Sequence, residues 1–262
     1  MRDTCDGLVI RVSEYGENDK LLTVLTAEHG QMVMIAKGAR SMRSKLMSLC
    51  HLFTYANFEY YEKHGRHWLS GGSVSDSFFG LNSDISGFAL ASYLVQLAGE
   101  ITGEGVPCER VLRMTLNSLY AIQNKLKPLP LIKSAYEIFA AEESGFSPDV
   151  SGCAECNEES FESGWLDIMN GRVVCEACLS RQGGADRAPV TDRFMTQTIL
   201  VPFNGEALAV WRYVSAAPLK RIFAFSVSEE GQKLLTRATE TYLVNHLERS
   251  FETLEFYNSV KD

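Results

Sequence analysis

The sequence predicts an α+β chain of three parts: an N-terminal five-stranded barrel over residues 1–80, an α-helical domain over 81–262, and a four-cysteine insert over 150–182. Three observations predict this order. Short apolar runs separated by turn residues fill the first eighty positions. The apolar spacing becomes helical near residue 82, and two C-x-x-C pairs interrupt the helical part. A chain of 262 residues has room for two such domains.

Five strands are predicted in the N-terminal part. Glycine and asparagine at 15–19 and 28–30 mark turns, and polar and apolar residues alternate after position 52. The expected strands are 7–12, 21–26, 31–36, 52–62 and 68–75. Five short strands favour a small closed barrel, with an OB-fold as the first choice and an SH3-like barrel as the alternative.

Helical spacing dominates the rest of the chain. The expected helices are 85–101, 107–127, 131–143, 191–201, 205–214 and 229–250. They should pack as one bundle, with the insert between the third and fourth helices. His246 lies on the apolar stripe of the last helix and is expected to be a core histidine rather than a metal ligand.

The insert carries two C-x-x-C pairs with eighteen residues between them. Four thiolates in a tetrahedron suit zinc and leave no open position for a substrate water, so one structural zinc ion is expected. An Fe–S cluster uses the same ligands. Disulfides would need an oxidising compartment, and the N-terminus has no apolar signal segment. The four expected metal ligands are Cys153, Cys156, Cys175 and Cys178.

Two short strands are expected between the cysteine pairs, around turns at Gly164 and at Asn170–Gly171. An insert of about thirty residues is too small to bury a core of its own. The metal is therefore expected to hold this segment together.

Charge is distributed unevenly along the chain. The formal net charge is −8, yet residues 1–80 are neutral and the rest carries the whole acidic excess. The segment 37–45 contains four cations and no anion. Such a loop can line phosphates, although it is also an ordinary solvated surface. The four cations are Lys37, Arg40, Arg43 and Lys45.

Other side chains near this loop can extend a nucleic-acid surface. Phe53, Tyr55 and Tyr61 share one strand face and are candidates for stacking on unpaired bases, with a place in the barrel core as the alternative. The cations that can enlarge the footprint are Arg11, Lys20, Lys63 and Arg66.

Common catalytic motifs are missing from the sequence. It has no G-x-x-x-x-G-K-[ST] loop, no G-x-S-x-G elbow and no H-E-x-x-H helix. We therefore expect a binding protein and not an enzyme. The alternatives are a zinc-containing protein-interaction adaptor without DNA binding, and a zinc hydrolase, which a four-cysteine site disfavours.

Three segments together resemble the N-terminus of the bacterial RecO recombination mediators. They are Asp6-Gly-Leu-Val-Ile-Arg11, then Tyr15-Gly-Glu-Asn-Asp-Lys20, then Ala36-Lys-Gly-Ala-Arg40 followed by Arg43-Ser-Lys45. The order of barrel, helices, four-cysteine insert and helices also matches, so the resemblance covers essentially the whole chain. It implies an OB-fold, a helical domain and a zinc site at the four cysteines.

The resemblance also implies a function. Members of this family bind single- and double-stranded DNA, anneal complementary strands, and with RecR load RecA onto DNA coated by single-strand binding protein. The DNA would lie on Lys37, Arg40, Arg43 and Lys45, with Arg11 and Lys20 beside them.

The resemblance further implies contact with the acidic C-terminal tail of single-strand binding protein. No apolar run approaches the length needed to cross a membrane, and three further scattered cysteines give an odd total that fits a reduced cytoplasm, so we expect the protein in the bacterial cytoplasm at the nucleoid and not at a membrane. Candidate residues for the acidic tail are Arg110, Arg113, Arg212 and Arg221. Arg172, Arg181 and Arg187 leave open whether the insert also contacts DNA.

Overall fold

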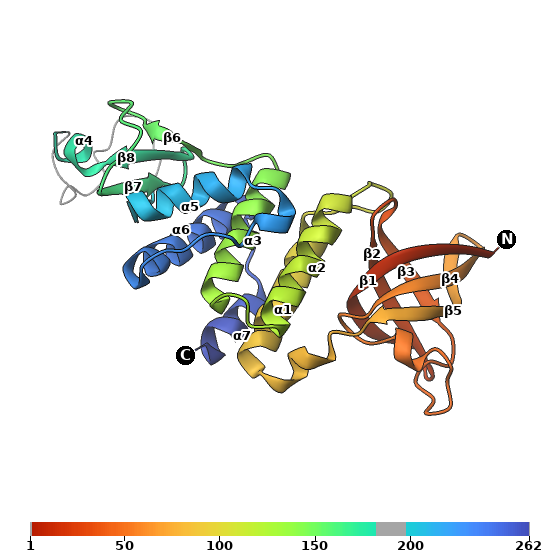
Figure 1. Ribbon diagram of the computed structural model, residues 1–262. Helices are drawn as coiled ribbons and strands as arrows, with labels where there is room; N and C mark the ends of the chain where they lie inside the picture. The colour runs from red at the N-terminus through yellow and green to blue at the C-terminus, as the bar shows by residue number, and fades with distance from the viewer. Residues whose placement is uncertain (1, 182–197, 262) are drawn as a thin grey trace. The chain divides into compact units, whose positions relative to one another are not determined.

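The computed structural model describes residues 2–181 and 198–261 (Figure 1). The chain forms two compact units, one of residues 1–126 with 251–262, the other of residues 127–250. The barrel therefore shares its unit with three helices. The domain limits 1–80, 81–262 and 150–182 stay a prediction.

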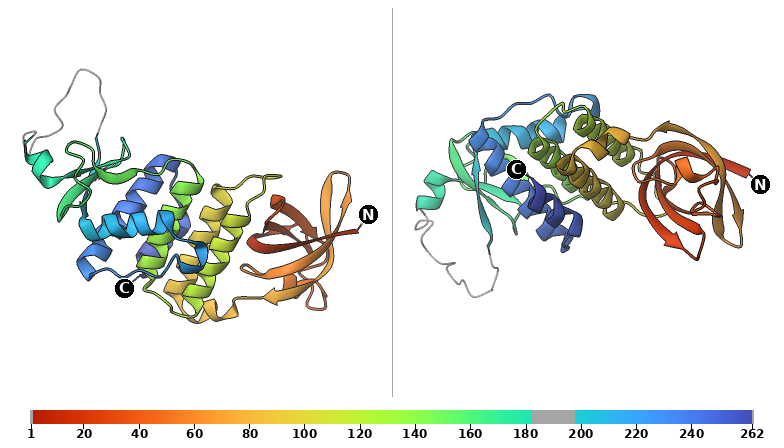
Figure 2. Two further views of the ribbon diagram at one scale, coloured as in Figure 1. Left: turned by 45° about the horizontal axis from the view of Figure 1, so that its top comes forward. Right: turned by 90° about the horizontal axis from the view of Figure 1, so that it is seen from below.

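The first unit contains a closed five-stranded barrel, as the sequence predicts (Figures 1 and 2). Its strands pair in the order β1-β2-β3-β5-β4, and β4 returns to β1. All pairings are antiparallel except β3 with β5, which is parallel and joins only two residue pairs. The strands are β1 (Arg2–Tyr15), β2 (Asp19–Thr26), β3 (Gly30–Ala36), β4 (Tyr55–Lys63) and β5 (Arg66–Asp76).

Alternation along the strands builds the barrel core, because successive side chains point to opposite faces of a strand. Ala56 and Phe58 are fully buried and Tyr60 is nearly so, which confirms the alternation predicted for the fourth strand. The strand begins only at residue 55. Phe53 precedes it with φ 68°, is buried, and packs edge-on against Phe88 at 5.5 Å. The expectation that Phe53 stacks on bases is therefore wrong.

Three helices complete the first unit: α1 (Ile85–Glu100), α2 (Glu109–Gln123) and α7 (Glu252–Val260). The Asp84 carboxylate accepts from the backbone N–H of Ser86 and caps α1. Tyr93 of α1 meets Phe251 edge-on at 5.6 Å. The sequence predicts α1 and α2 to within a few residues, but α7 was missed. Short one-turn helices lie at η1 (Met47–Leu49) and η2 (Phe79–Ser83).

The second unit packs helices around aromatic side chains. Trp211 is buried and meets Tyr242 edge-on at 5.7 Å. His246 is half-buried; its Nε2 lies 2.9 Å from the Ile168 carbonyl oxygen and its ring stacks on Phe146, so it makes structural contacts at the edge of the core. The helices are α3 (Leu129–Glu143), α4 (Glu176–Arg181), α5 (Gly205–Ala216), η3 (Leu219–Arg221) and α6 (Glu229–Leu247).

A charged group lies inside this helical core. The Lys133 side chain is fully buried, with its Nζ 2.7 Å from Glu137 Oε1 and 2.8 Å from Glu240 Oε2. The Thr239 hydroxyl donates to Glu137 at 2.7 Å. Burial raises the pKa of Glu137, and the Lys133 ammonium opposes that shift. The group links α3 to α6.

A four-stranded sheet carries the cysteines, and β9 packs against α5 and α6 (Figure 2). The two predicted strands appear as β7 and β8, but the sheet also includes β6 and β9. The strands, in the order β6-β8-β7-β9, are β6 (Asp149–Cys153), β7 (Ser163–Asp167), β8 (Arg172–Cys175) and β9 (Leu200–Asn204).

Two local predictions in this region are wrong. Gly164 lies within β7 and not at a turn, and a Cβ there would be 2.6 Å from the Val174 carbonyl oxygen. The last two residues of the predicted helix 191–201 instead form the start of strand β9. Positions 191–197 of that prediction lie outside the described residues. Gly171 does form the predicted turn, with φ 59°.

None of the described helices combines the length and the apolar character needed to span a membrane.

Candidate metal centre and nucleic-acid interface

The four cysteines of the insert converge on one point. Cys153 ends β6, Cys175 ends β8, Cys178 lies in α4, and Cys156 lies in the turn after β6. Their sulfur atoms all lie within 4.8 Å of one another. In the described part of the chain, no other group of three or more His, Cys, Asp or Glu side chains is arranged to share a metal ion.

The sulfur spacing fits a tetrahedral ion. Cys156 Sγ and Cys175 Sγ are 3.8 Å apart. A tetrahedron with metal–sulfur bonds of about 2.3 Å has edges of about 3.8 Å, whereas a disulfide bond is about 2.0 Å long. The four cysteines are thus free thiols whose spacing matches a single zinc-sized ion with four sulfur ligands.

Backbone and side-chain donors point at the sulfurs. The Cys175 N–H donates to Cys153 Sγ at 3.3 Å, and Arg181 Nη2 donates to Cys178 Sγ at 2.7 Å. Burial raises the pKa of Cys153, but backbone donors outweigh burial and lower its pKa to about 6. Burial raises the pKa of Cys178 to about 12 in the absence of a cation. A divalent ion would supply the charge that several adjacent thiolates need.

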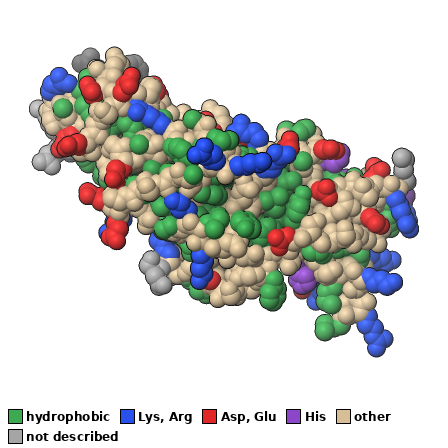
Figure 3. Space-filling view, viewed as in Figure 1, with side chains coloured by type: hydrophobic (Ala, Val, Ile, Leu, Met, Phe, Trp, Pro, Cys, Tyr) green, Lys and Arg blue, Asp and Glu red, His purple; other side chains and the backbone are tan. Residues whose placement is uncertain are grey.

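The basic segment 37–45 is a folded turn and not a loose loop. The Ser44 N–H donates to the Ser41 carbonyl oxygen at 2.9 Å, which closes a turn with Met42 and Arg43 at its corners. The Gly38 N–H donates to Asp19 Oδ1 at 2.8 Å. The Met42 side chain is 86% exposed. In Figure 3, lysine and arginine side chains project from the surface formed by the barrel.

The cations of this segment have different surroundings. Arg40 donates to the Glu17 carbonyl oxygen at 3.0 Å and pairs with Glu14 at 3.3 Å, so it ties the segment to the β1–β2 turn. Lys37, Arg43 and Lys45 are exposed, and among the described residues no acidic side chain forms an ion pair with them. Three cations are therefore available to a ligand.

The other predicted basic residues divide in the same way. Lys20 is half-buried and its Nζ donates to the Cys50 carbonyl oxygen at 3.2 Å, which gives it a structural contact. Arg11 and Lys63 are exposed on β1 and β4. Arg66 donates to the Tyr15 hydroxyl at 3.1 Å. Tyr55 and Tyr61 are half-buried.

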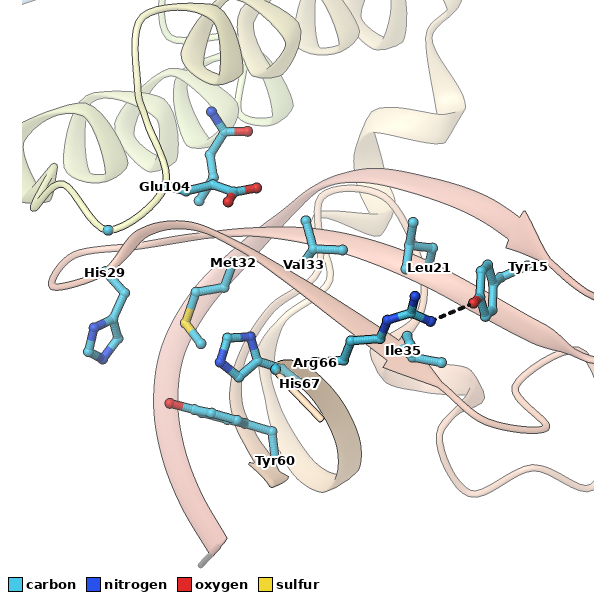
Figure 4. A pocket seen from close by; sticks show the side chains of 13 residues that line it. Tyr15, Leu21, His29, Met32, Val33, Ile35, Tyr60, Arg66, His67 and Glu104 are labelled. Atoms are coloured by element: carbon cyan, nitrogen blue, oxygen red, sulfur yellow. Dashed lines mark hydrogen bonds between the residues drawn. The ribbon is translucent and has the colours of Figure 1, made fainter. Parts of the chain in front are cut away.

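A cleft of about 610 Å³ opens in the barrel beside the short β3–β5 pairing (Figure 4). The Tyr60 ring meets the His67 ring edge-on at 5.3 Å. Of the residues that line the cleft, Arg66 is predicted from the sequence to extend a nucleic-acid surface. The others come from distant segments, which no local pattern connects. Besides Arg66, the labelled lining residues are Tyr15, Leu21, His29, Met32, Val33, Ile35, Tyr60, His67 and Glu104.

Several of the arginines that the sequence singles out beyond the barrel already have partners. Arg113 pairs with Glu109 at 2.7 Å. Arg212 donates to the carbonyl oxygens of Val150 and Ser151 and so ties α5 to β6. Arg172 pairs with Asp167 at 3.4 Å. Arg187 lies outside the described residues.

Comparison with known proteins gives one consistent result. The chain is 26% identical over 255 residues to the DNA repair protein RecO of Acetivibrio thermocellus, covering 97% of this chain and 95% of that protein. It is 25% identical over 256 residues to the RecO of Alkaliphilus metalliredigens, covering 97% and 98%. It is 27% identical over 240 residues to the RecO of Listeria innocua, covering 92% and 88%.

Family models cover nearly all of the chain. The model of the recombination protein O N terminal domain matches residues 1–78, and that of the C terminal domain matches residues 82–255. This agrees with the closed barrel and the four-cysteine cluster described above. The chain therefore belongs to the recombination protein O family.

Proposed function

We propose that this protein is a DNA repair and recombination mediator that binds single- and double-stranded DNA and anneals complementary strands. With RecR, it would help load RecA onto DNA coated by single-strand binding protein. Membership of the recombination protein O family supports a role in DNA repair and recombination. The observation that carries direct DNA binding is the basic turn 37–45, with exposed cations on a fixed backbone.

The proposed binding is electrostatic. Lys37, Arg43 and Lys45 neutralise phosphates, and Arg40 holds the turn while adding its own charge. Contacts of this kind release counterions, so affinity falls steeply with salt and depends little on base sequence. Annealing follows when two strands are held with reduced repulsion and exposed bases. No catalytic step is part of this mechanism.

The proposed metal is one structural zinc ion on Cys153, Cys156, Cys175 and Cys178. The sulfur spacing of 3.8 Å and the N–H donors around the thiols support it. Zinc with four protein ligands organises the chain and activates no water. Four free thiols fit a reducing compartment, so we place the protein in the bacterial cytoplasm, at the nucleoid.

The proposed protein partners are RecR, the acidic tail of single-strand binding protein and, indirectly, RecA. The exposed Arg221 remains a candidate for the acidic tail, whereas Arg113 and Arg212 already have partners.

The test is fluorescence anisotropy of a labelled single-stranded oligonucleotide over a salt series. The variant Arg43→Glu/Lys45→Glu removes two cations that make no ion pair within the described residues, so the turn should keep its fold. We expect the slope of log K against log salt to become shallower by about 1.4, at about 0.7 per lost phosphate contact. The matched control, Lys233→Glu/Arg237→Glu on α6, makes the same charge change and should bind as the wild type does.

Unchanged binding by Arg43→Glu/Lys45→Glu would contradict the assigned surface. If the wild type binds no DNA at low salt but retains protein partners, the protein is instead the zinc-containing adaptor considered above.

A further inference from the structure

The cleft beside β3 and β5 has an apolar middle and two charged ends of opposite sign. Leu21 and Val33 are half-buried on one wall, and Met32 and Ile35 are nearly buried. Figure 4 shows Arg66 and Tyr15 at one end and His29 and Glu104 at the other. A volume of about 610 Å³ lies within the range of roughly 300–1,000 Å³ typical of small-ligand sites.

The Arg66 end is continuous with the basic turn. Arg66 contacts the hydroxyl of Tyr15, the last residue of β1. The segment next to it, including Glu14 and Glu17, holds Arg40. A DNA strand whose phosphates lie along the basic turn would therefore reach the cationic end of the cleft.

The Glu104 end is fixed by the backbone. The Gly105 N–H donates to the His29 carbonyl oxygen at 2.9 Å, and the Gln31 N–H donates to the Gly103 carbonyl oxygen at 3.1 Å. Gly30 permits this contact, because a Cβ there would be 2.1 Å from the Gly103 oxygen. Glu104 itself is exposed, so its carboxylate can accept hydrogen bonds from a ligand.

These features select a class of ligand. A phosphate is disfavoured, because the middle of the cleft is apolar and Glu104 is negative. A planar base suits the same space, since its faces can pack on Val33 and on the half-buried His67, whose ring is held edge-on by Tyr60, while its polar edge meets Glu104. A carboxylate accepts from the exocyclic amine of cytosine, and thymine has no such amine.

We propose that the cleft holds one unpaired base of bound single-stranded DNA, and that Glu104 makes it prefer amine-bearing bases over thymine. This proposal rests on the proposed DNA binding and adds a base contact to its phosphate contacts. Continuity with the basic turn favours a nucleic acid over a peptide as the occupant.

The test compares twelve-residue oligo(dC) and oligo(dT) by anisotropy at one salt concentration and mildly alkaline pH. Every position of a homopolymer is identical, so the register of the strand does not matter. We expect the wild type to bind oligo(dC) about fivefold more tightly than oligo(dT), which is at the lower end of the discrimination that one base-edge contact provides. Glu104→Gln should bring the ratio close to one. The ratio is the readout because loss of a negative charge raises both affinities together.

Glu252→Gln is the matched control, since Glu252 is exposed on α7 of the same unit and does not line the cleft. It should keep the wild-type ratio. Equal binding of both oligonucleotides by the wild type, or an unchanged ratio in Glu104→Gln, would overturn the base assignment while DNA binding stands. Absence of binding to either oligonucleotide at low salt would overturn the DNA proposal itself.

Discussion

The barrel and the cysteine-bearing sheet are both small β structures, but they are stabilised in different ways. The barrel closes around a continuous apolar core that includes Val9, Leu22 and Phe58. At the thiol end of the sheet, the buried cluster consists of Val174 and three cysteines, with Phe161 and Leu179 against it. The opposite side of that sheet is anchored through Phe203, which packs on Trp211 at 6.1 Å.

The difference shows what each region needs in order to fold. Burial of apolar surface is enough for the barrel. The thiol end has little apolar surface of its own, since three of the four residues in its buried cluster are cysteines. A cation bound by the four sulfur atoms would hold this end together, whereas the strands next to the helices have their own packing. We therefore expect the proposed ligand binding at the barrel surface and the proposed metal binding at the sheet.

Removing a metal ligand should have the largest effect. Cys175→Ser is expected to release the metal, whose binding is worth on the order of 10–16 kcal/mol in zinc-finger peptides. Hydrogen exchange should then become fast over 150–181 and stay slow in the barrel, with metal content measured by mass spectrometry. Cys108→Ser is the control, because a hydroxyl can keep the hydrogen bond that this thiol makes to Thr26. If Cys175→Ser retained its metal, the claim that the thiol end of the sheet depends on a metal held by all four cysteines would be wrong.

A cavity in the barrel should have the reciprocal effect. Phe58 is fully buried, so Phe58→Ala is expected to cost roughly 3–5 kcal/mol of unfolding free energy. The metal content should not change, because the cysteines belong to the other unit. Denaturant unfolding, followed together with metal content, measures both. Loss of metal on barrel unfolding would show that the two regions fold as one.

The helical core differs from the barrel in a further respect. It buries charged side chains, whereas the described residues of the barrel include no buried charged side chain. Lys133→Met leaves Glu137 and Glu240 without their cation and should cost up to roughly 3–5 kcal/mol at neutral pH. Burial raises the folded-state pKa of Glu137 above its unfolded value. Its stability contribution is therefore present at low pH and lost as pH rises through the folded-state pKa.

The loss of unfolding free energy in Lys133→Met should therefore become smaller as the pH is lowered. Denaturant unfolding at several pH values measures this loss. Lys133→Met/Glu137→Gln should recover part of the loss at neutral pH. A deficit independent of pH would mean that lost packing, and not the loss of the Lys133 charge beside Glu137, destabilises the variant.

Local patterns predicted most of the fold. Alternation at Ala56 and Phe58 located a barrel strand, and the spacing of the two cysteine pairs identified the four thiols that the fold brings together. The predictions failed where contacts with residues distant in the sequence determine the local structure. Gly164 resembles a turn residue in the sequence, but close contact with Val174 explains its place in a strand. Phe53 follows the strand alternation, yet its positive φ turns the side chain into the core.

The candidate interface was predictable in part. Four cations in nine residues are visible in the sequence, but their partners are not. Glu14 and Glu17 hold Arg40, and this depends on how the β1–β2 turn approaches the basic turn. The cleft was not predictable, since Tyr15, Tyr60 and Glu104 lie far apart in the chain.

The most direct measurement is ultraviolet cross-linking of a single DNA strand that contains 5-iodocytosine, an amine-bearing base, with the cross-linked peptides identified by mass spectrometry. If the barrel surface binds DNA, cross-links should fall in peptides that contain the basic turn 37–45 and the cleft residues Tyr15 and Tyr60. Arg43→Glu/Lys45→Glu should lose them at the same protein concentration. Cross-links confined to 150–181, on the cysteine-bearing sheet, would contradict this assignment and move the DNA surface to the metal-bound region.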